Sequence, residues 1–277
     1  MPDTLSLENK VAIVTGSGRE NVIGAGIALA RNGASVVVHF VSGSSKARAA
    51  QVCETLQGVG GQAIAVQAAL DTIEGAKLLV RRTLEGFNTE HIDILVNNAG
   101  VAYFCPVTEE LDLEQLSDVF QINVLGPFNM VHAVLPNMPR GGRIINISST
   151  SSKRGNVNIS TYAASKAALD SLTWTWAGEG CISPPFPIHR YKNRLHFKHL
   201  GRSRGITVNA IAPGPVLTEL YPKGHEQALM ATEIALTRAE LRAGATADIG
   251  DAVLLLVNEK SRWITGQYIS VSGGVTY

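Results

Sequence analysis

The apolar positions of this chain form short uninterrupted runs that alternate with longer stretches in which apolar residues recur at helical spacing. A short apolar run bounded by glycine or polar residues is typical of a buried strand, and the longer repeat is typical of a helix. The pattern predicts strands over 10–15, 35–39, 63–67, 92–96, 143–147, 207–211 and 268–271. It predicts helices over 24–32, 45–56, 75–85, 113–138, 161–177 and 249–257.

Strands that alternate with helices form βαβ units, and consecutive units build a parallel sheet with helices on both faces. We therefore expect an α/β fold with a three-layer, doubly wound parallel sheet. No repeat or linker divides the 277 residues convincingly, so the chain is predicted to form a single domain. Ligands of such sheets bind beyond the carboxyl ends of the strands, so we expect the functional residues there.

The charge and cysteine content narrow the class of protein. The formal net charge is +1, which gives no whole-chain attraction for nucleic acid or a membrane surface. The sequence does not open on a leader-like segment, and no apolar stretch reaches the length of a transmembrane helix. Cys53, Cys105 and Cys181 match neither a metal pattern nor a disulfide framework. We expect a soluble cytoplasmic protein without a bound metal.

The first predicted strand leads into a glycine-containing turn that opens the next helix. The residues of interest in this turn are Gly16, Ser17, Arg19, Ile23 and Gly24. Glycine lets the backbone approach a pyrophosphate, and a helix N-terminus favours its negative charge. The strict G-x-G-x-x-G dinucleotide fingerprint fails, because Asn21 stands where a glycine is required. The alternative is a simple strand-to-helix turn without a ligand.

The end of the second predicted strand indicates which dinucleotide would bind. An NAD site places Asp or Glu there for the ribose 2′-hydroxyl, and the segment 39–46 contains neither. Arg19 and Ser42, together with Ser44 or Lys46, could instead hold a 2′-phosphate. We therefore expect NADP(H) rather than NAD(H) as the cofactor. The alternative is that Arg19 and Lys46 are simply solvated.

Tyr162 and Lys166 lie four positions apart in a predicted helix, so the phenol and the ammonium group share one helix face. A phenol titrates at about pH 10, and a neighbouring cation lowers its pKa. Such a tyrosine can donate or accept a proton near neutral pH, as carbonyl–alcohol redox chemistry requires. The alternative is an ordinary exposed pair, because this spacing also occurs by chance.

Ordered motifs along nearly the whole chain resemble the short-chain dehydrogenase/reductase family, in its classical group. These motifs are 97–100 (NNAG), Asn123, Ser149, Tyr162 with Lys166 (YxxxK), 213–218 and 272–274. The resemblance implies a Rossmann-type fold and an NADPH-dependent oxidoreductase that reduces a carbonyl to a secondary alcohol. Within the family, the chain looks like fungal 3-oxoacyl carrier-protein reductases and polyketide or naphthol ketoreductases.

The resemblance also implies roles for individual residues. Tyr162 would protonate the carbonyl oxygen, Ser149 would donate a hydrogen bond to it, and Lys166 would lower the pKa of Tyr162 and hold the nicotinamide ribose. Asn123 would hold a water that relays protons to Lys166. Cofactor contacts are implied for Gly16, Ser17, Arg19, Ile23, Gly24, Ser42, Asn98, Ala99, Gly100, Tyr162, Lys166, Pro213, Gly214, Val216 and Thr218. A homodimer or homotetramer is implied, paired through the helix after Asn123 and the helix that carries Tyr162.

Two other functions share these motifs and stay open. One is an alcohol dehydrogenase that acts oxidatively, and the other is a catalytically impaired NADP-binding protein. The intact set of Asn123, Ser149, Tyr162 and Lys166 favours an enzyme with a small-molecule carbonyl or alcohol substrate. The identity of that substrate is not encoded in any motif.

The chain departs from the family pattern at three places. The glycine loop is two residues longer, with Val22 where the middle glycine is expected. The acid expected after the third strand is missing, and Asp71 stands two positions later. Residues 180–199 form an atypical insertion that is rich in proline and in basic residues. Three interpretations of the insertion stay open: a basic loop for an anionic carrier, a disordered surface insertion, and translated intron sequence.

Overall fold

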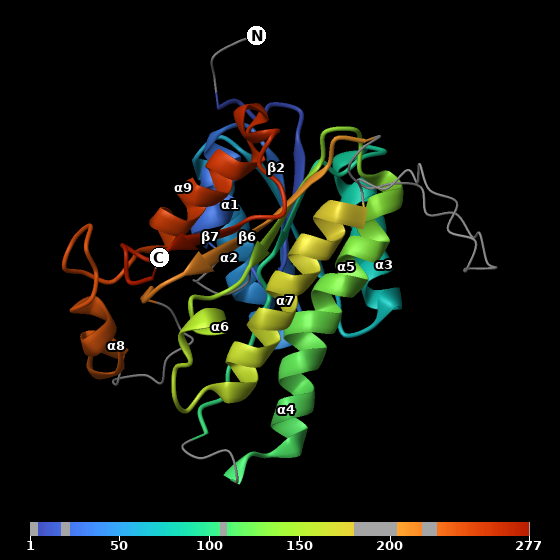
Figure 1. Cartoon of the computed structure of the whole chain (residues 1–277). Helices are drawn as coiled ribbons and strands as arrows, with labels where there is room; N and C mark the ends of the chain where they lie inside the picture. Colours follow the sequence, from blue (N-terminus) through green and yellow to red (C-terminus); the bar gives the residue numbers. More distant parts are fainter. Residues whose placement is uncertain (1–4, 18–22, 106–109, 180–203, 218–225, 277) are drawn as a thin grey trace, which may run out of the picture.

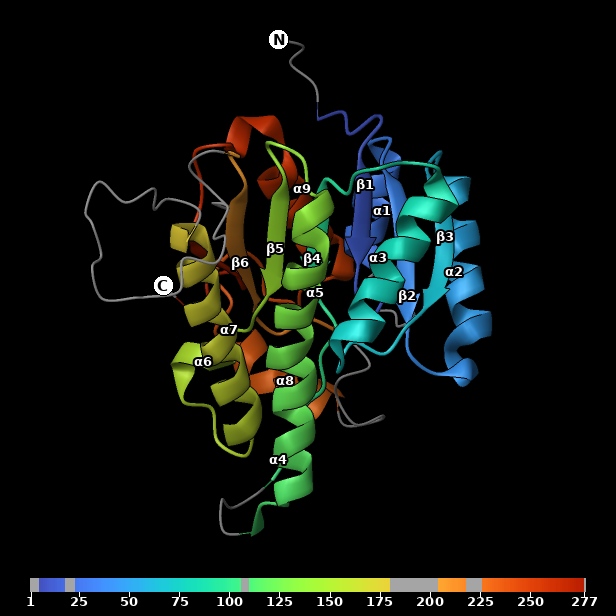
Figure 2. The same ribbon diagram turned by 90° about the vertical axis from the view of Figure 1, so that its right-hand side faces the viewer.

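The computed structural model describes residues 5–17, 23–105, 110–179, 204–217 and 226–276. Within these residues, one parallel sheet of seven strands runs in the order β3-β2-β1-β4-β5-β6-β7 (Figures 1 and 2). The strands are β1 Val11–Val14, β2 Ser35–Phe40, β3 Gln62–Gln67, β4 Ile94–Asn97, β5 Arg143–Ile147, β6 Thr207–Pro213 and β7 Tyr268–Val271. The strand order reverses between β1 and β4, which is the point where ligands of such sheets bind. The predicted doubly wound parallel sheet is confirmed.

Helices cover both faces of the sheet and complete a three-layer structure (Figure 2). The helices are α1 Ile23–Arg31, α2 Lys46–Gly58, α3 Ile73–Phe87, α4 Leu113–Phe120, α5 Gly126–Val134, α6 Ser151–Arg154, α7 Ser160–Glu179, α8 Glu226–Ile234 and α9 Thr246–Val257. Helices α1, α2 and α9 pack in one hydrophobic cluster with the sheet. Helices α3, α5 and α7 pack in a second cluster on the opposite face.

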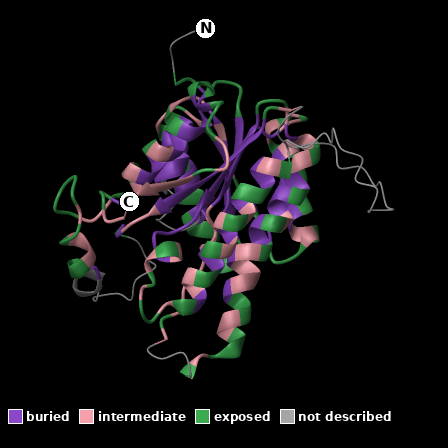
Figure 3. Cartoon of the chain, viewed as in Figure 1, coloured by how far each residue is buried: buried purple, intermediate pink, exposed green. Residues whose placement is uncertain are grey.

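The central strands are buried on both sides, as Figure 3 shows by colour. In β1, Ala12 and Val14 point into the cluster with α1 and α9, and Val11 and Ile13 point into the cluster with α3 and α5. All four side chains are buried. A strand covered on both faces needs apolar residues at every position, which is why the strands are continuous apolar runs in the sequence.

The helix predicted over 113–138 is interrupted in the structure. α4 ends at Phe120, a π-helical turn named η4 covers Gln121–Leu125, and α5 begins at Gly126. Pro127 lies in the first turn of α5 and has no N–H to donate to the carbonyl of Asn123, four residues earlier. The regular series of α-helical hydrogen bonds is therefore interrupted at this point. The break fixes the position of Asn123, which lies inside the π-helical turn and is fully buried.

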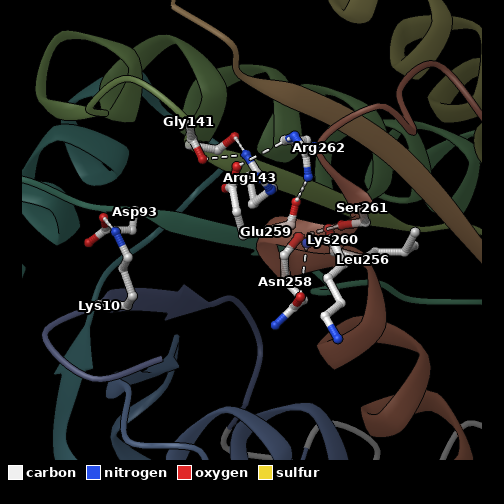
Figure 4. A network of polar contacts seen from close by, with 11 residues as sticks. Lys10, Asp93, Gly141, Arg143, Leu256, Asn258, Glu259, Lys260, Ser261 and Arg262 are labelled. Carbon is white, nitrogen blue, oxygen red and sulfur yellow. Dashed lines mark hydrogen bonds and ion pairs between the residues drawn. The ribbon is translucent and has the colours of Figure 1, made fainter. Parts of the chain in front are cut away.

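Ion pairs join elements at the amino ends of the strands (Figure 4). Lys10 Nζ lies 3.0 Å from Asp93 Oδ1, which ties the start of β1 to the residue before β4. Arg143 Nη2 at the start of β5 lies 3.0 Å from Glu259 Oε2 in the short helix Glu259–Ser261. The Arg143 side chain is buried, so this pair anchors the end of α9 to the sheet. These contacts lie at the amino ends of the strands, so the carboxyl ends stay open for ligands.

Two expectations from the sequence fall partly or wholly beyond the described structure. The atypical insertion at 180–199 lies outside the described residues, so its three interpretations stay open. In the part of the chain that is described, no helix combines the length and the apolar character needed to cross a membrane.

Candidate active site

A cavity of about 970 Å³ lies at the carboxyl ends of the strands. Of the residues predicted to act in catalysis or to bind the cofactor, those that line it are Gly16, Ser42, Asn98, Ala99, Gly100, Ser149, Tyr162, Lys166, Pro213, Gly214 and Val216. Ser17, Gly24 and Asn123 do not line this cavity. Arg19, Thr218 and the side chain of Ile23 lie outside the described residues. The structure thus gathers predicted residues from five strand ends and one helix.

Ser149 and Tyr162 form the polar centre of the cavity. Ser149 follows β5, and Tyr162 lies in the first turn of α7. The Ser149 side chain lies close enough to the Tyr162 phenol to lower its pKa by hydrogen bonding. The Ser149 hydroxyl also accepts a hydrogen bond of 3.1 Å from the backbone N–H of Ser151, which fixes its rotamer. Two hydroxyl groups are therefore held side by side, in position to contact the same oxygen of a bound carbonyl compound.

Lys166 lies one helical turn after Tyr162 and its side chain is buried. Its ammonium group donates a hydrogen bond of 2.8 Å to the carbonyl of Ile147 and lies 5.7 Å from the centre of the Tyr162 ring. Burial lowers the pKa of Lys166 to about 8, against the opposing effect of the Asp170 carboxylate. The ammonium group is therefore still mostly protonated at neutral pH.

The net shift of the Tyr162 pKa runs opposite to the predicted one. Burial raises the pKa of Tyr162 above its usual value of 10.0, and the hydrogen bond from Ser149 only partly offsets this effect. Desolvation disfavours the phenolate, and the ammonium group is engaged with the Ile147 carbonyl instead of the phenol oxygen. The phenol therefore stays protonated at neutral pH and holds a proton that it can donate.

Asn123 connects the loop after β4 to helix α7. Its Oδ1 accepts a hydrogen bond from the N–H of Val101, and its Nδ2 donates to the Val101 carbonyl, each at 2.9 Å. The same Nδ2 donates to the hydroxyl of Ser165 at 3.0 Å, and that hydroxyl donates to the carbonyl of Tyr162. Both amide hydrogens are therefore used within the protein. The side chain positions two walls of the cavity, and the predicted water relay stays a prediction.

At two glycines, the backbone beside the predicted cofactor site is not covered by a side chain. Gly16 has a φ of 71°, and an added Cβ would lie 2.8 Å from the Cα of Ala99. A Cβ on Gly100 would lie 3.3 Å from Lys166 Nζ and 3.2 Å from Asn123 Oδ1. Side chains at these positions would crowd the turn and cover the ammonium group. The open backbone and the adjacent cation fit a nicotinamide dinucleotide.

Thr15 ties the 97–100 segment to the end of β1. Its hydroxyl accepts hydrogen bonds from the N–H groups of Asn98 and Ala99 at 2.9 and 3.0 Å. The side chain of Asn98 donates to the Thr15 carbonyl at 3.0 Å. One layer below, Asn97 donates to Asn146 Oδ1 at 2.9 Å, which links β4 to β5. These bonds make the floor of the cavity a rigid part of the sheet.

His39 at the end of β2 is a site residue whose role the sequence did not predict. It is fully buried and lines the cavity. The N–H of Gly16 donates to His39 Nδ1 at 2.9 Å, so Nδ1 is the acceptor and Nε2 carries the proton. Nε2 then donates to the carbonyl of Ala68 at 2.9 Å. Burial lowers the pKa of His39 to about 4, so the ring is neutral at pH 7.

Two of the predicted cofactor residues have structural partners instead. The hydroxyl of Ser17 donates to the Val14 carbonyl at 2.7 Å and accepts from the His39 N–H at 2.8 Å. An added Cβ on Gly24 would lie only 1.9 Å from the carbonyl oxygen of Thr246, so this glycine permits the contact of α1 with α9. The identity of both residues is thus explained by packing, and their cofactor contacts stay predictions.

Two further described candidates follow two different strands. Ser42 is exposed after β2, and its hydroxyl is 2.7 Å from that of Ser44. Gly214 follows β6, and an added Cβ would lie 2.6 Å from the Cβ of Ser272. Among the described residues, no group of three or more His, Cys, Asp or Glu side chains is placed to hold a metal ion.

Comparison with known proteins identifies the family. A family model described as short chain dehydrogenase matches residues 10–181, and one described as Enoyl-(Acyl carrier protein) reductase matches residues 198–276. The chain is 35% identical to the short-chain dehydrogenase/reductase FrzI of Cladobotryum sp, covering 98% of this chain and 97% of FrzI. It is 34% identical to the hydroxynaphthalene reductase arp2 of Aspergillus fumigatus, covering 96% and 92%. The angucycline C-6 ketoreductase LanV, solved with bound NADP, has a TM-score of 0.80 at 31% identity, covering 98% and 96%.

These similarities, together with the parallel sheet and the cavity at its carboxyl edge, define a nucleotide-dependent oxidoreductase. The chain belongs to the short-chain dehydrogenase/reductase family. The resemblance predicted from the motifs is confirmed, and the cofactor is of the nicotinamide class.

Proposed function

We propose that the protein reduces a ketone to a secondary alcohol, with NADPH as the hydride source and Tyr162 as the proton donor. The observation that carries the proposal is that Ser149, Tyr162 and Lys166 line one cavity, with the Ser149 and Tyr162 side chains close together. NADPH, when bound, supplies the hydride that adds to the carbonyl carbon. The protein supplies the proton and holds the substrate.

The proton moves from the Tyr162 hydroxyl to the carbonyl oxygen. The phenol is protonated at neutral pH, so it has a proton to donate, and its raised pKa makes it a weaker acid that needs its phenolate to be stabilised. Ser149 donates a hydrogen bond to the same oxygen as negative charge develops there. Lys166, whose pKa is about 8, provides a positive charge that stabilises the phenolate left behind. Re-protonation of Tyr162 from solvent completes the cycle.

The choice of NADPH rests on the end of β2. His39, Phe40, Val41 and Ser42 line the cavity there, and none of them is the acid that would accept a hydrogen bond from a ribose 2′-hydroxyl. Ser42 and Ser45 offer hydroxyl groups at this end, and Arg19 is proposed to contact the 2′-phosphate. LanV was solved with NADP, which supports the same choice for this chain.

The substrate is proposed to be a cyclic or aromatic ketone. Tyr103, Phe104, Val157 and Ile159 line the cavity and give one wall an apolar, partly aromatic surface. A flat ring system buries more surface against such a wall than a short polar ketone does. The names of arp2 and LanV refer to hydroxynaphthalene and angucycline ring systems, which supports this class.

A panel of cyclic and open-chain ketones, assayed with NADPH and with NADH, tests the proposal. We expect NADPH oxidation with at least one bicyclic aromatic ketone, and at least about tenfold lower kcat/KM with NADH, because a charged contact to phosphate contributes about 1.5–3 kcal/mol. Tyr268→Phe is the matched control for Tyr162→Phe, because it removes a phenol hydroxyl from a residue that does not line the cavity. That hydroxyl lies 3.4 Å from the Ser149 carbonyl and also interacts with Ser152. Tight NADPH binding without turnover of any ketone would instead support the catalytically impaired alternative.

A further inference from the structure

Glu233 is a carboxylate in the wall of the cavity that the proposed mechanism does not use. It lies near the end of α8, and it lines the same cavity as Ser149 and Tyr162. Its side chain is only 20% exposed. A carboxylate in an otherwise largely apolar wall is costly to bury unless it is paired, so its partners and its free atoms are informative.

Two donors converge on one oxygen of this carboxylate. Arg154 Nη1 at the end of α6 lies 2.9 Å from Glu233 Oε1, and Asn156 Nδ2 donates to the same Oε1 at 2.8 Å. Both contacts fix the side-chain rotamer. Within the described residues, Oε2 receives no hydrogen bond. The carboxylate is therefore held rigidly with one acceptor atom left over.

The surroundings of Glu233 indicate what the free oxygen could contact. Asn156, Val157 and Ile159 follow α6 in the chain and line the cavity, as do Tyr103 and Phe104. The N–H of Cys105 donates to the carbonyl of Asn158 at 2.9 Å, which ties these two segments together. A ring system lying on this apolar wall would bring a ring substituent toward the carboxylate. A carboxylate accepts hydrogen bonds and donates none, so it favours a hydroxyl group there.

We propose that Glu233 is a specificity-determining residue that accepts a hydrogen bond from a hydroxyl group of the substrate. This inference rests on the proposed ketone reduction and narrows its substrate class to hydroxylated ring ketones. A methyl ether at the same ring position has no hydrogen to donate and leaves the carboxylate oxygen unpaired. A carboxyl group there would be repelled by the charge.

The test compares tetralones that carry a single hydroxyl group on the aromatic ring with their methyl ethers. For wild-type protein with NADPH, we expect kcat/KM to favour the hydroxyl compound over its ether by about tenfold or more for at least one ring position. Glu233→Gln should reduce this preference to less than about threefold, because it removes the charge but keeps the shape of the side chain. Equal kcat/KM for every hydroxyl compound and its ether in the wild type would overturn the inference.

A purely structural role for the Arg154–Glu233 pair makes a different prediction. Arg154→Ala breaks the ion pair but leaves the carboxylate, so it should lower the melting temperature and keep most of the hydroxyl preference. If Arg154→Ala and Glu233→Gln abolish the preference equally, the carboxylate acts only as a clamp between α6 and α8, and the inference is wrong.

A binding measurement separates this inference from the proposed function. Calorimetry with naphthols and their methyl ethers, added to the protein with NADP, measures the preference without turnover. A hydroxyl preference that Glu233→Gln removes supports the inference even if no ketone is reduced, in which case only the proposed function fails. Equal affinity for naphthols and ethers overturns the inference whether or not ketones are reduced.

Discussion

The burial of His39 leads to a prediction about how the free energy of unfolding depends on pH. The neutral ring connects the turn after β1 to the segment after β3, through Gly16 and Ala68. A protonated ring could no longer accept the Gly16 N–H, and the charge would be buried without a counter-ion. Folding therefore favours the neutral form, and the pKa falls from 6.5 to about 4. We perturb this arrangement with His39→Asn, which cannot titrate in this range.

The size of the effect follows from the two pKa values. At pH values between about 4 and 6.5, the unfolded chain binds a proton at His39 and the folded chain does not. The free energy of unfolding therefore falls as the pH decreases. The contribution is intact above pH 6.5 and is lost as the pH falls toward 4. The loss is about 1.4 kcal/mol per pH unit, so lowering the pH from 7 to 5 costs about 2 kcal/mol through this residue alone.

Urea unfolding at pH 7 and pH 5 measures this loss. The fluorescence of the buried Trp176 can report the transition, at one fixed protein concentration. His39→Asn should be less stable than the wild type at pH 7, because an Asn side chain cannot span from Gly16 to Ala68. The variant should then lose about 2 kcal/mol less than the wild type between pH 7 and pH 5. Equal losses in the two proteins would refute the reasoning, since carboxylates and other histidines contribute alike to both.

Three further predictions concern the cofactor, the assembly and the insertion. Arg19→Ala should weaken NADPH binding by about 10–150-fold and NADH binding far less, as measured by fluorescence titration; equal losses would remove Arg19 from the 2′-phosphate site. Light scattering at micromolar concentration should show a dimer or tetramer, because Leu125 and Phe128 on η4 and α5 are 46% and 49% exposed, and a monomer would contradict the predicted pairing. Deletion of 180–199 should preserve or improve the melting temperature and kcat/KM; a folded, NADPH-binding deletion variant without turnover would show that the segment is functional.

The strands were predictable because burial on both faces leaves a simple signal in the sequence. The strands over 143–147 and 268–271 have the predicted limits, and the others differ by a few residues at their ends. Helices α6 and α8 were not predicted. α6 has only four residues and ends at Gly155, so it is too short to show a helical repeat.

The site residues were predictable where a family motif specifies the residue type and its spacing. Properties that depend on the folded surroundings, such as burial and distant partners, were not predictable. Ser149, Tyr162 and Lys166 meet in one cavity as the motifs predict. The direction of the Tyr162 pKa shift was wrong, because helical spacing reveals the nearby charge but not the extent of burial. The roles of His39 and Glu233 depend on partners that are distant in sequence, such as Ala68 and Arg154, and no local pattern contains them.

The central claim is that Tyr162 donates the proton in a carbonyl reduction, and Tyr162→Phe tests it most directly. The measurement is single-turnover oxidation of bound NADPH by a ketone that the wild type reduces, with NADPH affinity determined in parallel. The account predicts a rate about 10²–10⁴-fold lower with nearly unchanged NADPH affinity, because only the proton donor is removed. Retention of more than about a tenth of the wild-type rate would contradict it, since general acid catalysis by this phenol would then contribute too little.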